Sequence, residues 1–186
     1  MTLAISPAPN FGAFVRVCYD HPQMNVQPTP SPGISRSVVQ AMVLCILVAG
    51  TLDISDAFIF FGFRGTPPER LLQGIASGLL GPSALHRGMP VALLGLAIHY
   101  FITWVWATLF IVGSLRFPVL RKCPAVSGPL YGLLIYGIMN YIVLPHSRVG
   151  GHPAFKLPVF VNGVAALVFC MGLPIAVISK RVLPAD

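Results

Sequence analysis

The sequence predicts an all-α membrane protein with four transmembrane helices and one short interfacial amphipathic helix between spans one and two. Hydrophobic residues make up 55% of the chain and charged residues only 9%, whereas a soluble domain is about 25% charged. The mean hydropathy is +0.80. Four apolar segments are long enough to cross a bilayer core, which takes roughly 20 helical residues, at about 37–63, 90–114, 125–144 and 158–179.

The chain divides into a tail and one membrane domain. Residues 1–35 are rich in proline and lack the basic start, apolar run and small-residue cleavage site of a secretory signal. We expect a disordered tail here. Alternatively, part of the stretch precedes the true start of translation. A four-helix transmembrane domain is expected to follow at residues 36–182.

The first span, residues 37–63, contains no Lys or Arg but carries Asp53 and Asp56. An ionisable side chain at bilayer depth costs about 2.5–3.5 kcal/mol, so it should face protein or a water-filled cavity. The two acids are three residues apart and share a helix face with small residues, Ala49, Gly50 and Ala57. We therefore expect this face to pack closely against other helices. Two adjacent carboxylates cannot both ionise cheaply in a low dielectric, so a proton, a cation or a base is expected beside them.

Residues 67–80 predict a helix that is too short to span. Thr66 at the N-cap, a proline at the first turn and Glu69 form a capping box, and Gly81-Pro82 provides the stop. We expect an interfacial helix that lies on the membrane surface or dips in against the bundle. Its glycine row would let a neighbouring backbone approach, at Gly74, Gly78 and Gly81.

Each of the other three spans carries a polar residue. His99 of span two belongs to a stripe of small and polar residues at helical spacing, Ala92, Gly95, His99 and Thr103. Asn140 lies near the end of span three, which we expect to stop at Pro145. Asn162 lies near the start of span four, where Pro174 predicts a local bend further along.

These polar residues share one half of the membrane. At about 1.5 Å per residue, Asp53 and His99 lie roughly 13–15 Å below the same surface, and the other three lie nearer to it. We expect an outward-opening polar pocket in which the acids face the histidine, built from Asp53, Asp56, His99, Asn140 and Asn162. The alternative is a helix clamp, worth about 0.6 kcal/mol per interhelical hydrogen bond. Two acids and one histidine could ligate zinc, but no ligand spacing supports a metal site, and none is predicted.

The formal charge of +7 does not indicate nucleic-acid binding, because the basic residues are scattered singly among loops rather than gathered in a stripe. Such residues are topology signals and contacts to lipid headgroups. One membrane side would hold Arg16, Arg36, Arg116, Arg121, Lys122, Lys180 and Arg181, and the other Arg64, Arg70, Arg87, Arg148 and Lys156. The larger set predicts that both termini lie in the cytoplasm.

The chain resembles a group of uncharacterised bacterial four-span inner-membrane proteins and, more distantly, the YagU-like membrane proteins. The resemblance covers about residues 45–180. It rests on GTLD at 50–53, RG at 64–65, QGIASG at 73–78 and the embedded His99. It implies a bacterial inner-membrane location and supplies no catalytic residues.

The function predicted from these features is that of a non-enzymatic structural or accessory membrane module. The lipid bilayer and a second copy or another membrane protein are the expected partners, and no cofactor is predicted. An enzyme is disfavoured because Ser55 points to a different helix face from the acids, which leaves no nucleophile–base pair. The alternative is a small proton-coupled transporter or permeation subunit using Asp53, Asp56 and His99. Four spans are few for a transporter and no inverted repeat is visible, although a dimer would supply eight.

Overall fold

The computed structural model describes residues 34–149 and 155–183, which form helices joined by short turns and contain no strand. The α-helices are α2 (Ile34–Gly62), α3 (Pro68–Leu80), α4 (Met89–Arg116), α5 (Val119–Lys122), α6 (Pro124–Ile138), α7 (Leu144–His146), α8 (Leu157–Ala166) and α9 (Leu173–Val182). A short 3₁₀ turn, η1 (Pro82–His86), and two π-helical segments, η2 (Met139–Val143) and η3 (Leu167–Gly172), complete the order. The predicted all-α fold is confirmed.

Four helices are long and apolar enough to cross a membrane, and they identify an integral, multi-pass membrane protein. They run from Arg36 to Gly62, Met89 to Arg116, Pro124 to His146 and Leu157 to Val182. Their positions match the predicted spans within a few residues. The prediction of a disordered tail at 1–35 lies outside the described residues, apart from Ile34 and Ser35, which begin α2.

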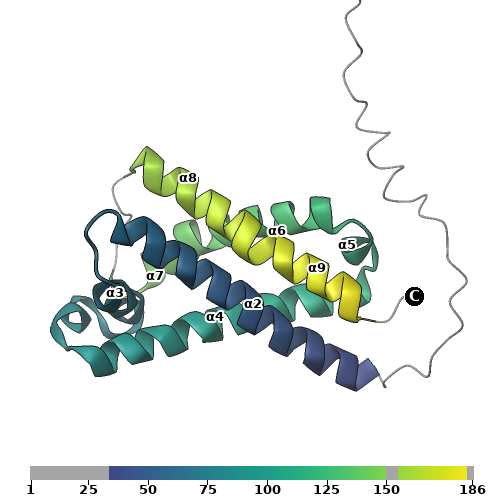
Figure 1. Ribbon diagram of the computed structural model, residues 1–186, viewed down its shortest axis with the longest axis horizontal. Helices are drawn as coiled ribbons and strands as arrows, with labels where there is room; N and C mark the ends of the chain where they lie inside the picture. Colours follow the sequence, from purple (N-terminus) through teal and green to yellow (C-terminus); the bar gives the residue numbers. More distant parts are fainter. Residues whose placement is uncertain (1–33, 150–154, 184–186) are drawn as a thin grey trace, which may run out of the picture. The chain divides into compact units, whose positions relative to one another are not determined.

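The four spans pack as a bundle in which α2 lies against α4 and against the continuous helix formed by α8, η3 and α9 (Figure 1). The helix α6 packs on the other side of that fourth helix. The core is made of small and apolar side chains, including Ala41, Cys45, Ala49, Ala107, Phe110, Ile111, Ile135, Ile175 and Ala176. Large side chains such as Ile59 and Phe63 are exposed and suit contact with lipid.

Glycines bring α6 and the fourth helix into backbone contact. A Cβ added to Gly132 would lie 2.4 Å from the carbonyl oxygen of Leu167, and one added to Gly172 would lie 2.2 Å from that of Gly128. Real Cβ atoms never approach backbone so closely, so only glycine fits at these positions. Close packing of this kind drives helix association in lipid, where apolar surface alone gives no preference for protein over hydrocarbon.

Both π-helical segments directly precede a Leu-Pro pair. The N–H of Leu144 bonds to the carbonyl of Met139, and that of Leu173 bonds to the carbonyl of Val168, each five residues back. A proline ring clashes with the carbonyl four residues earlier, and the widened turn moves that carbonyl aside. At Pro174, where a local bend was predicted, the structure shows this widened turn. Span three ends at His146, one residue beyond the predicted stop at Pro145, because the same adjustment accommodates the proline in the last helical turn.

The helix α3 begins one residue later than predicted, and its capping box does not form. Its N-cap is Pro67, which has extended dihedral angles (φ −68°, ψ 150°), and no side chain caps the helix. The reason is local: a residue that precedes a proline is pushed out of the helical region, and Pro67 precedes Pro68. Thr66 therefore lies outside the helix rather than at its N-cap.

The helix α3 lies at the end of the bundle where α2 ends and α4 begins (Figure 1). Its buried side is partly polar and consists of Leu72, Gln73, Ala76 and Ser77. Burial of Gln73 is possible because its side-chain amide donates to Glu69 Oε1 and to the carbonyl of Gly88, both at 3.1 Å.

The close approach expected at the glycine row of α3 occurs instead on its partner helix. A Cβ on Gly74 or Gly81 would meet nothing within 4 Å, and one on Gly78 only Ser147 Cβ at 3.8 Å. In contrast, a Cβ on Gly95 of α4 would lie 1.9 Å from the carbonyl oxygen of Leu72. The glycine that joins α3 to the bundle is therefore Gly95.

Candidate functional site

The candidate site is a layer of polar side chains between α2 and its neighbours. Asp53 lies about 14 Å from the Gly62 end of α2, and His99 lies about 15 Å from the Met89 end of α4, at 1.5 Å per residue. These two ends lie together, so the acid and the histidine meet at one depth. The side chain of Asp53 is 20% exposed, and His99 is buried.

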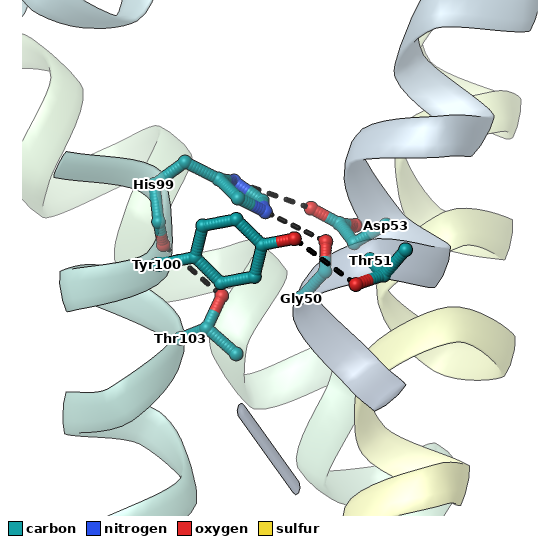
Figure 2. Close-up of polar contacts among 6 residues, drawn as sticks. All are labelled: Gly50, Thr51, Asp53, His99, Tyr100 and Thr103. Carbon is teal, nitrogen blue, oxygen red and sulfur yellow. Dashed lines mark hydrogen bonds and ion pairs between the residues drawn. The ribbon is translucent and has the colours of Figure 1, made fainter. Parts of the chain in front are cut away.

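The His99 ring points from α4 into α2 and contacts it through both nitrogens (Figure 2). Nε2 lies 2.8 Å from the carbonyl oxygen of Gly50, and Nδ1 lies 4.0 Å from Asp53 Oδ2. The first distance is that of a hydrogen bond, and the second is an ion-pair distance that is too long for one. The imidazole therefore links the backbone and the acid of α2 to α4.

Two further features hold α2 and α4 together beside the imidazole. The hydroxyl groups of Tyr100 and Thr51 lie 3.0 Å apart, within hydrogen-bond distance (Figure 2). A Cβ on Gly50 would lie 2.9 Å from two carbons of the Tyr100 ring. Glycine at position 50 therefore leaves room for the aromatic ring and exposes its carbonyl to His99.

The second acid has a different partner from the first. Asn162 of α8 donates from Nδ2 to Asp56 Oδ2 at 2.8 Å, which links α2 to the fourth helix. Three helical residues turn about 300°, so side chains at 53 and 56 diverge by about 60° and can reach different neighbours. The structure thus pairs Asp53 with His99 and Asp56 with Asn162.

Asn140 makes its hydrogen bond within its own helix. Its Nδ2 donates to the carbonyl of Tyr136 at 3.0 Å, one turn earlier. This contact uses the side chain locally, as polar side chains in a helix often do. Of the five predicted site residues, four form two interhelical pairs, and Asn140 joins neither.

One cleft of about 310 Å³ lies at the α3 end of the bundle, lined by Pro67, Glu69, Arg70, Gln73, Leu85, His86 and Gly88. None of the five predicted site residues lines it. Among residues 34–149 and 155–183, no three acids, histidines or cysteines are grouped so that they could hold a metal ion. The expected polar pocket at the acids stays a prediction.

Sequence reasoning missed two neighbours of the acids. The Gly50 carbonyl bonds to His99, although Gly50 was assigned only a packing role; its position one turn before Asp53 was the available signal. Cys170 of η3 lies within electrostatic range of both Asp53 and Asp56, yet in the sequence it is simply a small residue in an apolar run.

Comparison with protein-family models, curated proteins and solved structures found no match in any of the three. The chemistry of the site therefore follows from its own geometry. A carboxyl group beside an imidazole can bind and exchange a proton, and paired polar groups can also hold helices in register. Among the described residues, no hydroxyl or thiol forms a hydrogen bond with the imidazole.

Proposed function

We propose that the chain is a multi-pass protein of the bacterial inner membrane that acts as a non-enzymatic structural or accessory module. The observation that carries this proposal is the pairing of each intramembrane acid with a polar side chain of another helix, Asp53 with His99 and Asp56 with Asn162. Such pairing lowers the cost of polar groups in hydrocarbon and orients the helices. The site then maintains the bundle as a surface for a second copy or another membrane protein.

The location and orientation are part of the same proposal. The resemblance to four-span inner-membrane proteins supports the location. The dense basic cluster between spans two and three supports a cytoplasmic side there, with Arg116, Arg121 and Lys122 in a short connection. Both termini would lie on that side.

The clamp is tested by replacing its partners singly and together. In detergent, Asp53→Leu or His99→Leu alone should lower the free energy of unfolding, because each leaves a buried polar group unpaired. The double variant should recover most of the loss, since no polar group then remains. Lipid-facing Ile59→Ala serves as the control. A double variant that is weaker than both single variants would count against a clamp.

A second candidate function is a small proton-coupled transporter or permeation subunit. The observation that favours it is the 4.0 Å separation of Asp53 Oδ2 and His99 Nδ1, together with the 20% exposure of the acid. At this distance the two side chains are not joined by a direct hydrogen bond. The pair therefore has room and access to exchange a proton.

This candidate predicts a pH-dependent flux in proteoliposomes that Asp53→Asn abolishes without unfolding the protein. Asp56→Asn is the matched control, because Asp56 is bonded to Asn162 and has no contact with the histidine among the described residues. Absence of flux with the parent protein, or flux unchanged by Asp53→Asn, would remove this function.

A further inference from the structure

The Gly50 carbonyl determines which nitrogen of His99 carries a proton. Nε2 lies 2.8 Å from that oxygen in a buried contact. A carbonyl oxygen only accepts hydrogen bonds, so the nitrogen must be the donor. The oxygen has a second lone pair for the backbone bond within α2. In every state that keeps this contact, Nε2 is therefore protonated.

The second nitrogen then shares its proton with the acid. With Nε2–H occupied, Nδ1 of a neutral ring presents a lone pair toward Asp53 Oδ2 at 4.0 Å. A carboxylate facing that lone pair would be repelled, and two protons between the atoms would repel as well. When the site holds one proton, two arrangements are possible: a protonated carboxyl beside neutral imidazole, or a carboxylate beside imidazolium. Each holds one proton and is neutral overall, which is the least costly charge state in a membrane. Release of that proton leaves the more costly state, in which a carboxylate faces the lone pair.

We propose that Asp53 and His99 form a single-proton binding site in which the proton passes between Oδ2 and Nδ1 after the two side chains close from 4.0 Å to hydrogen-bond distance, and enters or leaves only through Asp53. A histidine relays protons by taking one at one nitrogen and releasing one from the other. Here the Nε2–H donates to the Gly50 carbonyl, so the ring cannot release a proton from Nε2 without breaking that hydrogen bond. His99 acts as a fixed partner, and Asp53 is the exchanging group.

The surroundings of the pair agree with this assignment. Asp53 keeps 20% of its side chain exposed, whereas His99 is 9% exposed, so the acid has the better access to a proton donor or acceptor. Three titratable groups lie near the pair on the packed elements, namely Asp56 of α2, Tyr100 of α4 and Cys170 of η3. Asp56 is bonded to Asn162, and the Tyr100 hydroxyl to Thr51. In the contacts of the described residues, none of the three forms a hydrogen bond with Nδ1 in place of Asp53.

This inference deepens the proton-coupled candidate and rests on it for a role in the cell, but its test is separate. The whole protein, with ¹⁵N-labelled histidine, is placed in lipid nanodiscs and its ring nitrogens are followed by NMR across pH. His99→Gln identifies the His99 signals among the five histidines. We expect Nε2 to stay protonated throughout, and Nδ1 to show a proton shared with a carboxyl group.

The variants sharpen the test. In Asp53→Asn, the amide can neither ionise nor give up a proton to Nδ1, so the signal of a shared proton should be lost while Nε2–H remains. Asp56→Asn should leave both signals unchanged. A deprotonated Nε2, or equal effects of Asp53→Asn and Asp56→Asn on the two nitrogen signals, would overturn the inference even if flux were found. The expected NMR pattern without any flux would instead keep the proton site and remove transport.

Discussion

The contact at Gly95 allows the sharpest test of how the bundle is built. Gly95→Ala places a Cβ 1.9 Å from the carbonyl oxygen and 2.7 Å from the carbonyl carbon of Leu72. Both are backbone atoms, so no side-chain rotation relieves the clash. The helices α3 and α4 must separate by about 1 Å or more to restore ordinary contact distances. Overpacking of this kind costs about 1–3 kcal/mol.

The matched control is Gly74→Ala on the facing helix, where a Cβ meets nothing within 4 Å. Alanine favours a helix over glycine by about 1 kcal/mol at either position. Because this gain is common to both variants, the difference between their free energies of unfolding isolates the clash. We therefore expect Gly95→Ala to be less stable than Gly74→Ala by about 1–3 kcal/mol.

Two measurements check this expectation in detergent or nanodiscs. Chemical unfolding gives the difference in stability. Hydrogen exchange followed by mass spectrometry locates it, since amides of α3 should exchange faster in Gly95→Ala than in the parent protein. Equal stability of the two variants, or faster exchange confined to other helices, would refute the packing argument.

The same reasoning extends to three other contacts. Gly132→Ala should be less stable than Gly137→Ala by about 1–3 kcal/mol, because a Cβ at 132 meets Leu167 backbone at 2.4 Å and one at 137 meets nothing; equal stability would contradict the close contact of α6 with the fourth helix. A double-mutant cycle of Asp56→Leu and Asn162→Leu should give a coupling of about 0.6 kcal/mol, and up to about 1.7 kcal/mol, for the hydrogen bond between them; strictly additive effects would argue against it. Tyr100→Phe and Thr51→Val should each lower the free energy of unfolding by about 0.5–1.5 kcal/mol. The double variant should lose no more than one single variant, because both substitutions remove the same hydrogen bond, and unfolding curves of the three variants check this.

The spans and the inward orientation of the acids followed from the sequence because they depend on one helix at a time. Apolar length sets a span, and the cost of a carboxylate in hydrocarbon sets the direction of Asp53. The small and polar stripe that helical spacing indicated in span two is buried, at Ala92, Gly95, His99 and Thr103. Apolar length and the placement of polar residues on one face are properties of a single helix in a lipid bilayer.

The partners of the polar residues could not be deduced in this way, because they depend on which helices are neighbours. The divergence of Asp53 toward α4 and Asp56 toward α8 requires the crossing geometry of three helices. The prediction of close packing at the α3 glycines was wrong for the same reason. The row at Gly74 and Gly78 has the spacing for such packing, but the close contact forms where the Leu72 backbone lies against Gly95. The wrong prediction of the α3 N-cap has a purely local cause, because Pro68 pushes the preceding Pro67 out of the helical region.

The glycine contact between α6 and the fourth helix also bears on self-association. Gly128 and Gly132 have the Gly-x-x-x-Gly spacing by which transmembrane helices commonly dimerise. In this chain that groove is already filled from within, because Gly172 and its neighbours occupy it. A second copy cannot dock there without dismantling the monomer. A homodimer would have to use other, outward-facing surfaces, of which the exposed Leu130, Leu133 and Leu134 are one example. Substitutions in the glycine motif would therefore report on folding rather than on assembly.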